Sequence, residues 1–127
     1  MANIISSYKD LIVWQKSIEL VTLIYKLTDN FPKSETYGLV SQIRRAVISI
    51  PANIAEGHRR NHLPEFIQFL AVANGSAAEV ETYFEIIKRL NYADERETKP
   101  LEELLLEILK MLNVLSRNLK RSKITHL

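Results

Sequence analysis

Apolar side chains recur at alternating intervals of three and four residues in four long stretches of this chain. This spacing places them on one face of an α-helix, and a repeat near 3.5 residues favours helices that coil around one another with a left-handed twist. No stretch alternates apolar and polar residues in the manner of a strand. We therefore predict an all-α protein whose four helices form a left-handed, antiparallel, up-down-up-down bundle.

Glycines, prolines and capping residues divide the chain into four predicted helices, over about residues 8–28, 34–57, 64–91 and 95–120. Ser34 is the expected N-cap of the second helix, and Gly57 is its expected end. Pro64 is tolerated in the first turn of the third helix. Asp94 and Glu97 have the spacing of a capping box at the start of the fourth.

Three of the four apolar stripes indicate the core without ambiguity. In the second helix the stripe consists of Leu39, Ile43, Ala46, Ile50 and Asn53. The third helix has the longest stripe, formed by Phe66, Leu70, Ala73, Ala77, Val80, Phe84 and Ile87. The fourth carries Leu101, Leu105, Ile108, Leu112, Leu115 and Leu119. We expect these residues to face a shared centre.

The first helix has more apolar surface than one core requires. Its regular stripe, which we expect to face the core, is formed by Leu11, Trp14, Ile18, Val21 and Tyr25. A second stripe comprises Ile12, Val13, Leu20, Leu23, Ile24 and Leu27. Two explanations remain equally open: a partner covers the surplus, or the helix is fully buried in a wide bundle.

Five residues form a predicted structural motif in the second and third helices. Pro51 removes a backbone donor inside a helix at a cost of about 3 kcal/mol, so we expect a kink there. Asn53 falls on the apolar stripe and, with Glu56 and Gly57, forms a polar cluster; a buried asparagine more often fixes register than takes part in catalysis. Gly75 costs about 1 kcal/mol relative to alanine, which fits a close approach of the two helix backbones.

The residue pattern does not favour an enzyme. His58 and His62 have a spacing that can share a metal, but loop histidines in a basic patch explain them better, and the paired Glu-x-x-His motifs of di-iron bundles are missing. Glu79, Glu81 and Glu85 lack histidine partners and resemble a solvated helix face. No phosphate-binding loop, nucleophile elbow or dinucleotide fingerprint is present. We expect no catalysis, metal, cofactor or small-molecule substrate.

Composition favours one cytoplasmic domain spanning residues 1–127. A chain of 127 residues is long enough to bury one core. Cysteine is absent, which excludes disulfides and thiolate metal sites and suits a reducing compartment. Neither a signal-like segment nor a stretch of membrane-spanning length is apparent, so no membrane partner is expected.

Charge is distributed unevenly although the net charge is only +2. Residues 44–62 carry +3 and the basic tail 117–127 carries +4, whereas residues 63–93 and 94–116 carry −2 and −3. The candidate phosphate contacts for RNA or DNA are Arg44, Arg45, Arg59 and Arg60, together with Lys88 and Arg89. Ion pairing of these side chains with acidic helices or with a neighbouring subunit is an equally good explanation.

Four segments resemble, in order and spacing, those of the 23S rRNA intervening-sequence protein family. They are Leu11–Lys16, Phe31–Leu39, Gln42–Ala46 and Ser49–Gly57. The likeness extends over about residues 8 to 120. It implies a four-helix bundle, a ring-like homopentamer and a gene often found within inserts in bacterial 23S rRNA genes, and it implies no known reaction. The fold is also similar to the accessory protein of diversity-generating retroelements, a pentameric bundle that engages nucleic acid through a basic surface.

Three functions therefore compete. The leading hypothesis is a non-catalytic homo-oligomer that is associated with nucleic acid, in which repetition of the subunit strengthens weak individual sites. The second is a protein-interaction scaffold with no direct role in nucleic-acid binding, suggested by the apolar surplus of the first helix and the acidic region 94–116. The third, a metal-dependent or small-molecule enzyme, depends only on the histidines and carboxylates.

Overall fold

The computed structural model describes residues 7–125, and within this range all regular structure is helical. Its elements are η1 (Tyr8–Asp10), α1 (Ile12–Thr28), η2 (Lys33–Glu35), α2 (Leu39–Arg59), α3 (Leu63–Arg89) and α4 (Glu95–Thr125). The prediction of an all-α protein with four helices is confirmed. Residues 1–6 and 126–127 of the predicted domain lie outside the described residues.

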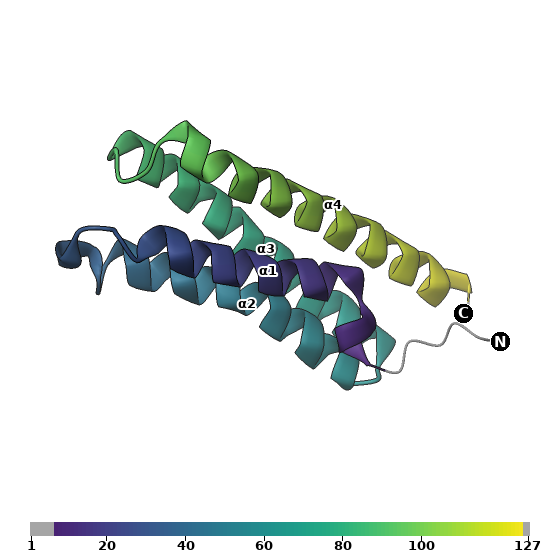
Figure 1. Ribbon diagram of the computed structural model, residues 1–127. Helices are drawn as coiled ribbons and strands as arrows, with labels where there is room; N and C mark the ends of the chain where they lie inside the picture. Colours follow the sequence, from purple (N-terminus) through teal and green to yellow (C-terminus); the bar gives the residue numbers. More distant parts are fainter. Residues whose placement is uncertain (1–6, 126–127) are drawn as a thin grey trace.

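Each long helix packs against two others. Contacts join α1 to α2, α2 to α3, α3 to α4 and α4 back to α1, while the diagonal pairs do not touch in the described part of the chain. Figure 1 shows that the chain reverses direction from each of these helices to the next. Pro51 is buried inside the unbroken span of α2. The kink at Pro51 and the left-handed coil stay predictions.

The core contains most of the predicted stripes of α2, α3 and α4. In α3 every stripe residue is buried except Phe66, which packs against the core while partly exposed. In α4 the first four stripe residues are buried, and Leu115 and Leu119 are partly buried. In α2 the buried side chains are Val40, Ile43, Ala46, Val47, Ile50, Pro51 and Ile54.

The prediction for α1 was wrong in part, because its buried apolar side chains, Val13, Leu20 and Ile24, all belong to the second stripe. Leu11, Trp14 and Val21 of the regular stripe are partly buried and pack against the core. Leu20 and Ile24 are fully buried, whereas Ile18 and Tyr25 of the regular stripe are 38% and 37% exposed. Two polar residues complete the buried face: the hydroxyls of Ser17 and Thr28 donate to the carbonyls of Val13 and Ile24, at 2.7 and 2.8 Å. These bonds satisfy both hydroxyls, so their burial leaves no unpaired polar group.

The predicted ends of α2 were also wrong. Ser34 lies in η2, and α2 begins at Leu39, whose backbone N–H donates to the Glu35 carboxylate at 3.1 Å. A side chain four residues upstream therefore replaces the expected N-cap. At the other end Gly57 is helical and buried, and the chain leaves the helix through Asn61, which adopts a left-handed φ of 52°.

The predicted starts of α3 and α4 are confirmed. Pro64 lies in the first turn of α3, where its missing N–H has no helical partner to lose. At α4 the Glu97 N–H donates to the Asp94 carboxylate at 2.9 Å, and the Asp94 N–H donates back to Glu97 at 3.1 Å. α4 continues to Thr125, beyond the expected end near residue 120, and so includes most of the basic tail 117–127.

The motif residues around the α2–α3 contact have different roles from those expected. Asn53 is only partly buried and donates to the carbonyl and hydroxyl oxygens of Ser49, at 2.7 and 2.8 Å, so the prediction that it lies in the core seam is wrong. Gly57 allows the close approach instead: a Cβ there would lie 2.7 Å from the Cβ of Phe69 and 3.0 Å from Cδ1 of Phe66.

Gly75 does not contribute to packing within the subunit. It is exposed, and a Cβ added to it would meet nothing within 4 Å. The expectation of a close backbone approach at this residue is therefore wrong. The hydrogen bond from Ser76 to Ser49, 2.8 Å long, shows that the neighbouring residue of α3 faces α2.

Candidate nucleic-acid interface and apolar surfaces

Arg44 is held within the subunit at the end of α1. Its guanidinium donates to the Thr28 hydroxyl at 3.0 Å and to the Tyr25 carbonyl and the Asp29 carboxylate at 3.3 Å each. It also lies 4.3 Å from the centre of the Tyr25 ring. A cation at a helix C-terminus satisfies free carbonyls and opposes the negative end of the helix dipole. Arg44 is thus a cap for α1.

Arg60 likewise pairs within its own subunit. It contacts the carboxylates of Glu56 and Glu65, at 2.8 and 3.3 Å, and its guanidinium carbon lies 5.1 Å from the centre of the Phe69 ring. The hydrogen bond that Arg60 donates to the Glu56 carboxylate is the main cause of the raised pKa of Arg60. These contacts hold the α2–α3 turn together.

Lys88 and Arg89 pair with acidic side chains near the opposite end of the molecule. Lys88 contacts Glu102 of α4 at 2.8 Å, and this bond raises its pKa. Arg89 contacts Glu85 at 3.1 Å, one turn earlier in α3. Glu79 and Glu81, the other two acids of α3 noted from the sequence, are exposed.

The six predicted phosphate contacts therefore do not form one surface. Four are paired internally, while Arg45 and Arg59 are exposed and have no polar partner within residues 7–125. Fourteen residues separate these two on α2, which corresponds to about 21 Å along the helix. Ion pairing within the subunit thus accounts for four of the six residues, and phosphate contact stays a prediction for Arg45 and Arg59.

η1 and the C-terminal ends of α2 and α4 lie toward the same end of the molecule (Figure 1), although α4 touches neither η1 nor α2 in the described part of the chain. Lys9, Arg59, Arg117 and Lys120 are exposed there and have no ion-pair partner in the part of the chain that the structure describes. We call these four residues the basic end. Sequence reasoning missed Lys9, because the distance along the chain from Lys9 to the basic tail hides their proximity in the fold.

The two histidines have different neighbours. The His58 ring packs edge-on against Phe66, with ring centres 5.7 Å apart, and Nδ1 of His62 lies 3.1 Å from the Glu65 carboxylate. Among the described residues there is no group of three histidine, cysteine, aspartate or glutamate side chains arranged to hold a metal ion.

The connections that follow α1 and α3 are tied by a polar contact that the sequence did not indicate. The Tyr92 hydroxyl donates to the Glu35 carboxylate at 2.7 Å, and the same carboxylate accepts the Leu39 N–H. The Tyr92 bond is the main cause of a lowered pKa at Glu35, and the bond to Glu35 raises the pKa of Tyr92. The arrangement is a helix cap with every polar group partnered.

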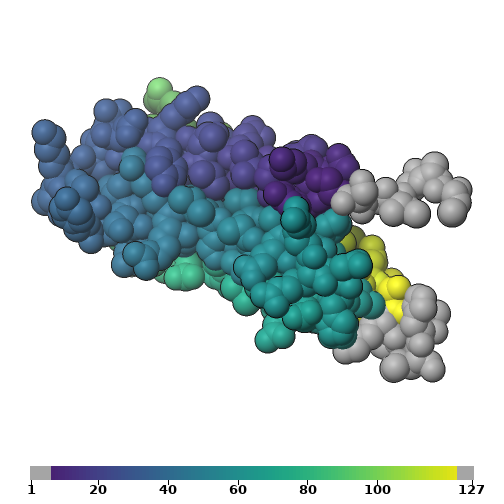
Figure 2. All heavy atoms as spheres, turned by 90° about the horizontal axis from the view of Figure 1, so that it is seen from below, coloured from purple at the N-terminus to yellow at the C-terminus, as the bar shows by residue number. Residues whose placement is uncertain are grey.

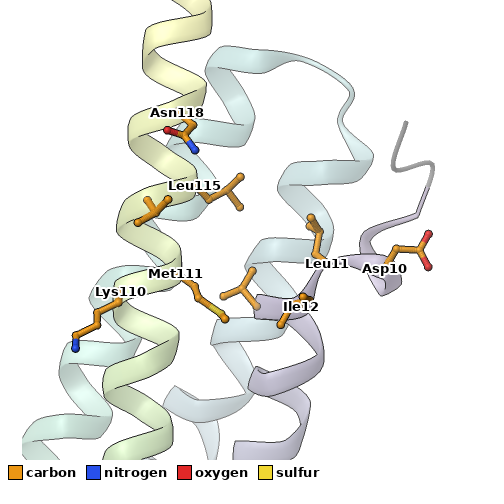
Figure 3. Close-up of a pocket in the computed structure, with 9 residues that line it drawn as sticks. Asp10, Leu11, Ile12, Lys110, Met111, Leu115 and Asn118 are labelled. Atoms are coloured by element: carbon orange, nitrogen blue, oxygen red, sulfur yellow. The ribbon is translucent and has the colours of Figure 1, made fainter. Parts of the chain in front are cut away.

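An apolar groove of about 490 Å³ opens between the start of α1 and the second half of α4. Figure 3 shows side chains from both segments along it. Two of the lining residues, Ile12 and Val114, are 59% and 47% exposed. Asp10, Lys110 and Asn118 are the polar residues among a lining otherwise made of Leu11, Ile12, Val13, Met111, Val114 and Leu115. The groove presents contact surface and no evident catalytic group.

Comparison with known protein families identifies the family of this chain. A family model described as 23S rRNA-intervening sequence protein matches residues 9–114. The chain belongs to this family. The chain also resembles a crystal structure, at 1.70 Å, of a protein with unknown function from the S23 ribosomal protein family of Bacteroides thetaiotaomicron VPI-5482. The two share 29% identity with a TM-score of 0.74, over 83% of this chain and 98% of the other.

A search of the curated proteins found none that matches the chain. No described helix of the chain has both the length and the apolar character needed to cross a membrane.

Proposed function

We propose that this protein is a non-catalytic, cytoplasmic homo-oligomer, a pentamer by family resemblance, that associates with RNA through its basic end. The observation that carries the proposal is that Lys9, Arg59, Arg117 and Lys120, which lie toward one end of the molecule, are exposed and have no ion-pair partner among residues 7–125. Exposed cations that pair with phosphates release counterions from the nucleic acid, which supplies affinity without base recognition. The family description, 23S rRNA-intervening sequence protein, makes RNA the first polyanion to test.

Assembly strengthens such a site. A few cations per subunit give weak phosphate binding, but linked copies present the same end several times to one strand. A purely structural role is the competing account for Arg59, because it lies in the last turn of α2, where positive charge opposes the helix dipole.

The test is a titration of fluorescently labelled RNA and of DNA of the same sequence at two salt concentrations. We expect binding that weakens as salt rises, and weaker binding with a smaller salt dependence in the Arg59→Ala, Arg117→Ala double variant. Arg89→Ala is the matched control, because Arg89 is exposed but paired with Glu85. Undetectable RNA binding at low salt, or equal losses in the control and the double variant, contradicts the proposal.

The apolar groove favours a second function, that of a protein-interaction scaffold. An open groove of about 490 Å³ lined by Ile12, Met111 and Val114 offers contact area but no phosphate site. Under this account, protein partners stay bound after nuclease treatment and are lost in Val114→Ser, which makes the groove polar without adding charge next to Arg117. The RNA proposal predicts instead that nuclease removes bound material and that Val114→Ser binds RNA normally.

A further inference from the structure

The apolar groove between α1 and α4 lies where the two helices no longer run side by side. α1 begins at Ile12, whereas α4 continues past the groove to Thr125. Figures 1 and 2 show the start of α1 and the last turns of α4 toward the same end of the molecule. η1 contacts α1 and α2 but not α4 within residues 7–125. The segment that precedes α1 therefore does not close the groove.

The interior of the groove suits an apolar occupant. Ile12 and Val114 are 59% and 47% exposed, and Met111 is only partly buried between them and the core. Figure 3 shows the two charged lining residues, Asp10 and Lys110, directed away from the space between the helices. A charged ligand would lose its hydration there without gaining a partner, so the groove favours apolar side chains.

Two such side chains stand directly upstream in the sequence. Ile4 and Ile5 precede Ser7, the first described residue, by three and two positions. Ser7 lies next to the groove, because its carbonyl accepts the N–H of the lining residue Asp10 at 3.1 Å. A chain advances by at most about 3.6 Å per residue, so Ile5 is within about 7 Å of Ser7 and Ile4 within about 11 Å.

We propose that Ile4 and Ile5 of the same chain occupy the groove and cover Ile12 and Val114. Isoleucine gains free energy on leaving water and is among the residues most often fully buried. The short connection to Ser7 raises the local concentration of both side chains to about the millimolar range, so weak apolar contacts are enough. The inference goes beyond the proposed function, because a protein partner that uses the groove has to displace this segment first.

A second copy of the chain fits the groove less well. Nine residues line the groove, whereas a stable interface between two proteins takes about 20–30 residues from each side. The volume of about 490 Å³ lies in the range that buries one small ligand, which leaves room for two isoleucine side chains. The groove is thus suited to a tethered segment and is too small to hold two copies together.

Thiol labelling tests the proposal, because the chain has no cysteine. Val114→Cys places a thiol in the groove. Leu106→Cys is the matched control, since Leu106 is 49% exposed on the same helix and does not line the groove. Each variant is labelled with and without the paired substitutions Ile4→Ser and Ile5→Ser, which remove apolar surface and no charge. Circular dichroism verifies that all four proteins are folded.

We expect the paired serine substitutions to speed labelling at position 114 by about tenfold, because a segment that occupies the groove for about nine-tenths of the time leaves the thiol open for the remainder. Labelling at position 106 should not change. Equal rates at position 114 with and without the isoleucines, or a similar acceleration at position 106, overturns the inference. The RNA titration is a separate readout, since the serine substitutions alter no charge.

The source of the covering segment is tested by dilution and by cross-linking. Protection by the same chain does not depend on protein concentration, whereas protection that is lost on dilution shows that a second copy covers the groove and contradicts the proposal. In the Ile5→Cys, Val114→Cys variant, oxidised glutathione should produce a disulfide within one chain, seen as a single-chain band on a non-reducing gel. Disulfide-linked dimers in its place overturn the assignment to the same chain.

Discussion

Helices α1 and α3 carry stripes of the same regularity, yet the stripe of α3 is buried almost throughout while no residue of the regular stripe of α1 is fully buried. In α3 the opposite face contains Gly75, Glu79 and Thr82, so one side alone is apolar enough to bury. In α1 both sides are apolar, and the side with the less regular spacing is buried. The spacing of apolar residues therefore identifies a helix. It identifies the buried face only when the opposite face is polar.

The largest expected effect comes from comparing the same substitution, isoleucine to alanine, on the two faces of α1. We expect Ile24→Ala to destabilise the protein by about 2–5 kcal/mol, because Ile24 is fully buried and its loss leaves a cavity. Ile18→Ala removes the same atoms from a side chain that is 38% exposed, so its effect is smaller. Urea unfolding at one protein concentration measures both, and a larger loss at Ile18 reverses the assignment.

A second prediction concerns the close contact of α2 with α3. Gly57→Ala places a Cβ 2.7 Å from that of Phe69, and strain of this kind costs about 1–3 kcal/mol. Thermal unfolding should show a lower midpoint than in the wild type. An unchanged midpoint indicates that Phe66 and Phe69 shift without penalty, and it removes Gly57 from the packing argument.

Gly75→Ala sharpens the contrast between the two sides of α3. Its Cβ enters open space in the subunit, so alanine should stabilise the helix by about 1 kcal/mol through its higher helix propensity. Urea unfolding of the variant and the wild type at one protein concentration measures the gain. A loss of stability in Gly75→Ala contradicts the open surroundings of Gly75 in the subunit.

The smallest expected effect lies where the connections after α1 and α3 meet. Glu35 has a lowered pKa, mainly because Tyr92 donates to it, so its contribution to stability is complete at neutral pH and is lost as pH falls through its usual range and below. Tyr92→Phe should bring the pKa of Glu35 closer to its ordinary value and flatten stability against pH on the acid side. An unchanged acid profile in urea unfolding excludes this bond as the cause.

Much of the fold was predictable from local chemistry. The stripes of α3 and α4, Pro64 and the box formed by Asp94 and Glu97 are short-range signals that the tertiary structure preserves. The start of α2 was not predictable in this way, because Ser34 and Glu35 are both chemically able to cap a helix and only the fold decides between them.

The candidate site was less predictable for a physical reason. The charge of an arginine is evident from the sequence, but whether it pairs with a carboxylate or faces solvent is not. Its partner lies on another helix or on another turn of the same helix. Arg44 and Arg60 are occupied by contacts that depend on the assembled bundle, whereas Arg59 is not. Lys9 joins the basic end only because α1 begins near the ends of α2 and α4.

The most direct test of the account is thiol labelling, since the chain has no cysteine of its own. Ile18→Cys and Ile24→Cys place a thiol on the outer and inner faces of α1, at side chains that are 38% exposed and fully buried. We predict that the thiol at position 18 reacts fast and that the thiol at position 24 reacts slowly. Faster reaction at position 24 than at position 18 contradicts the account.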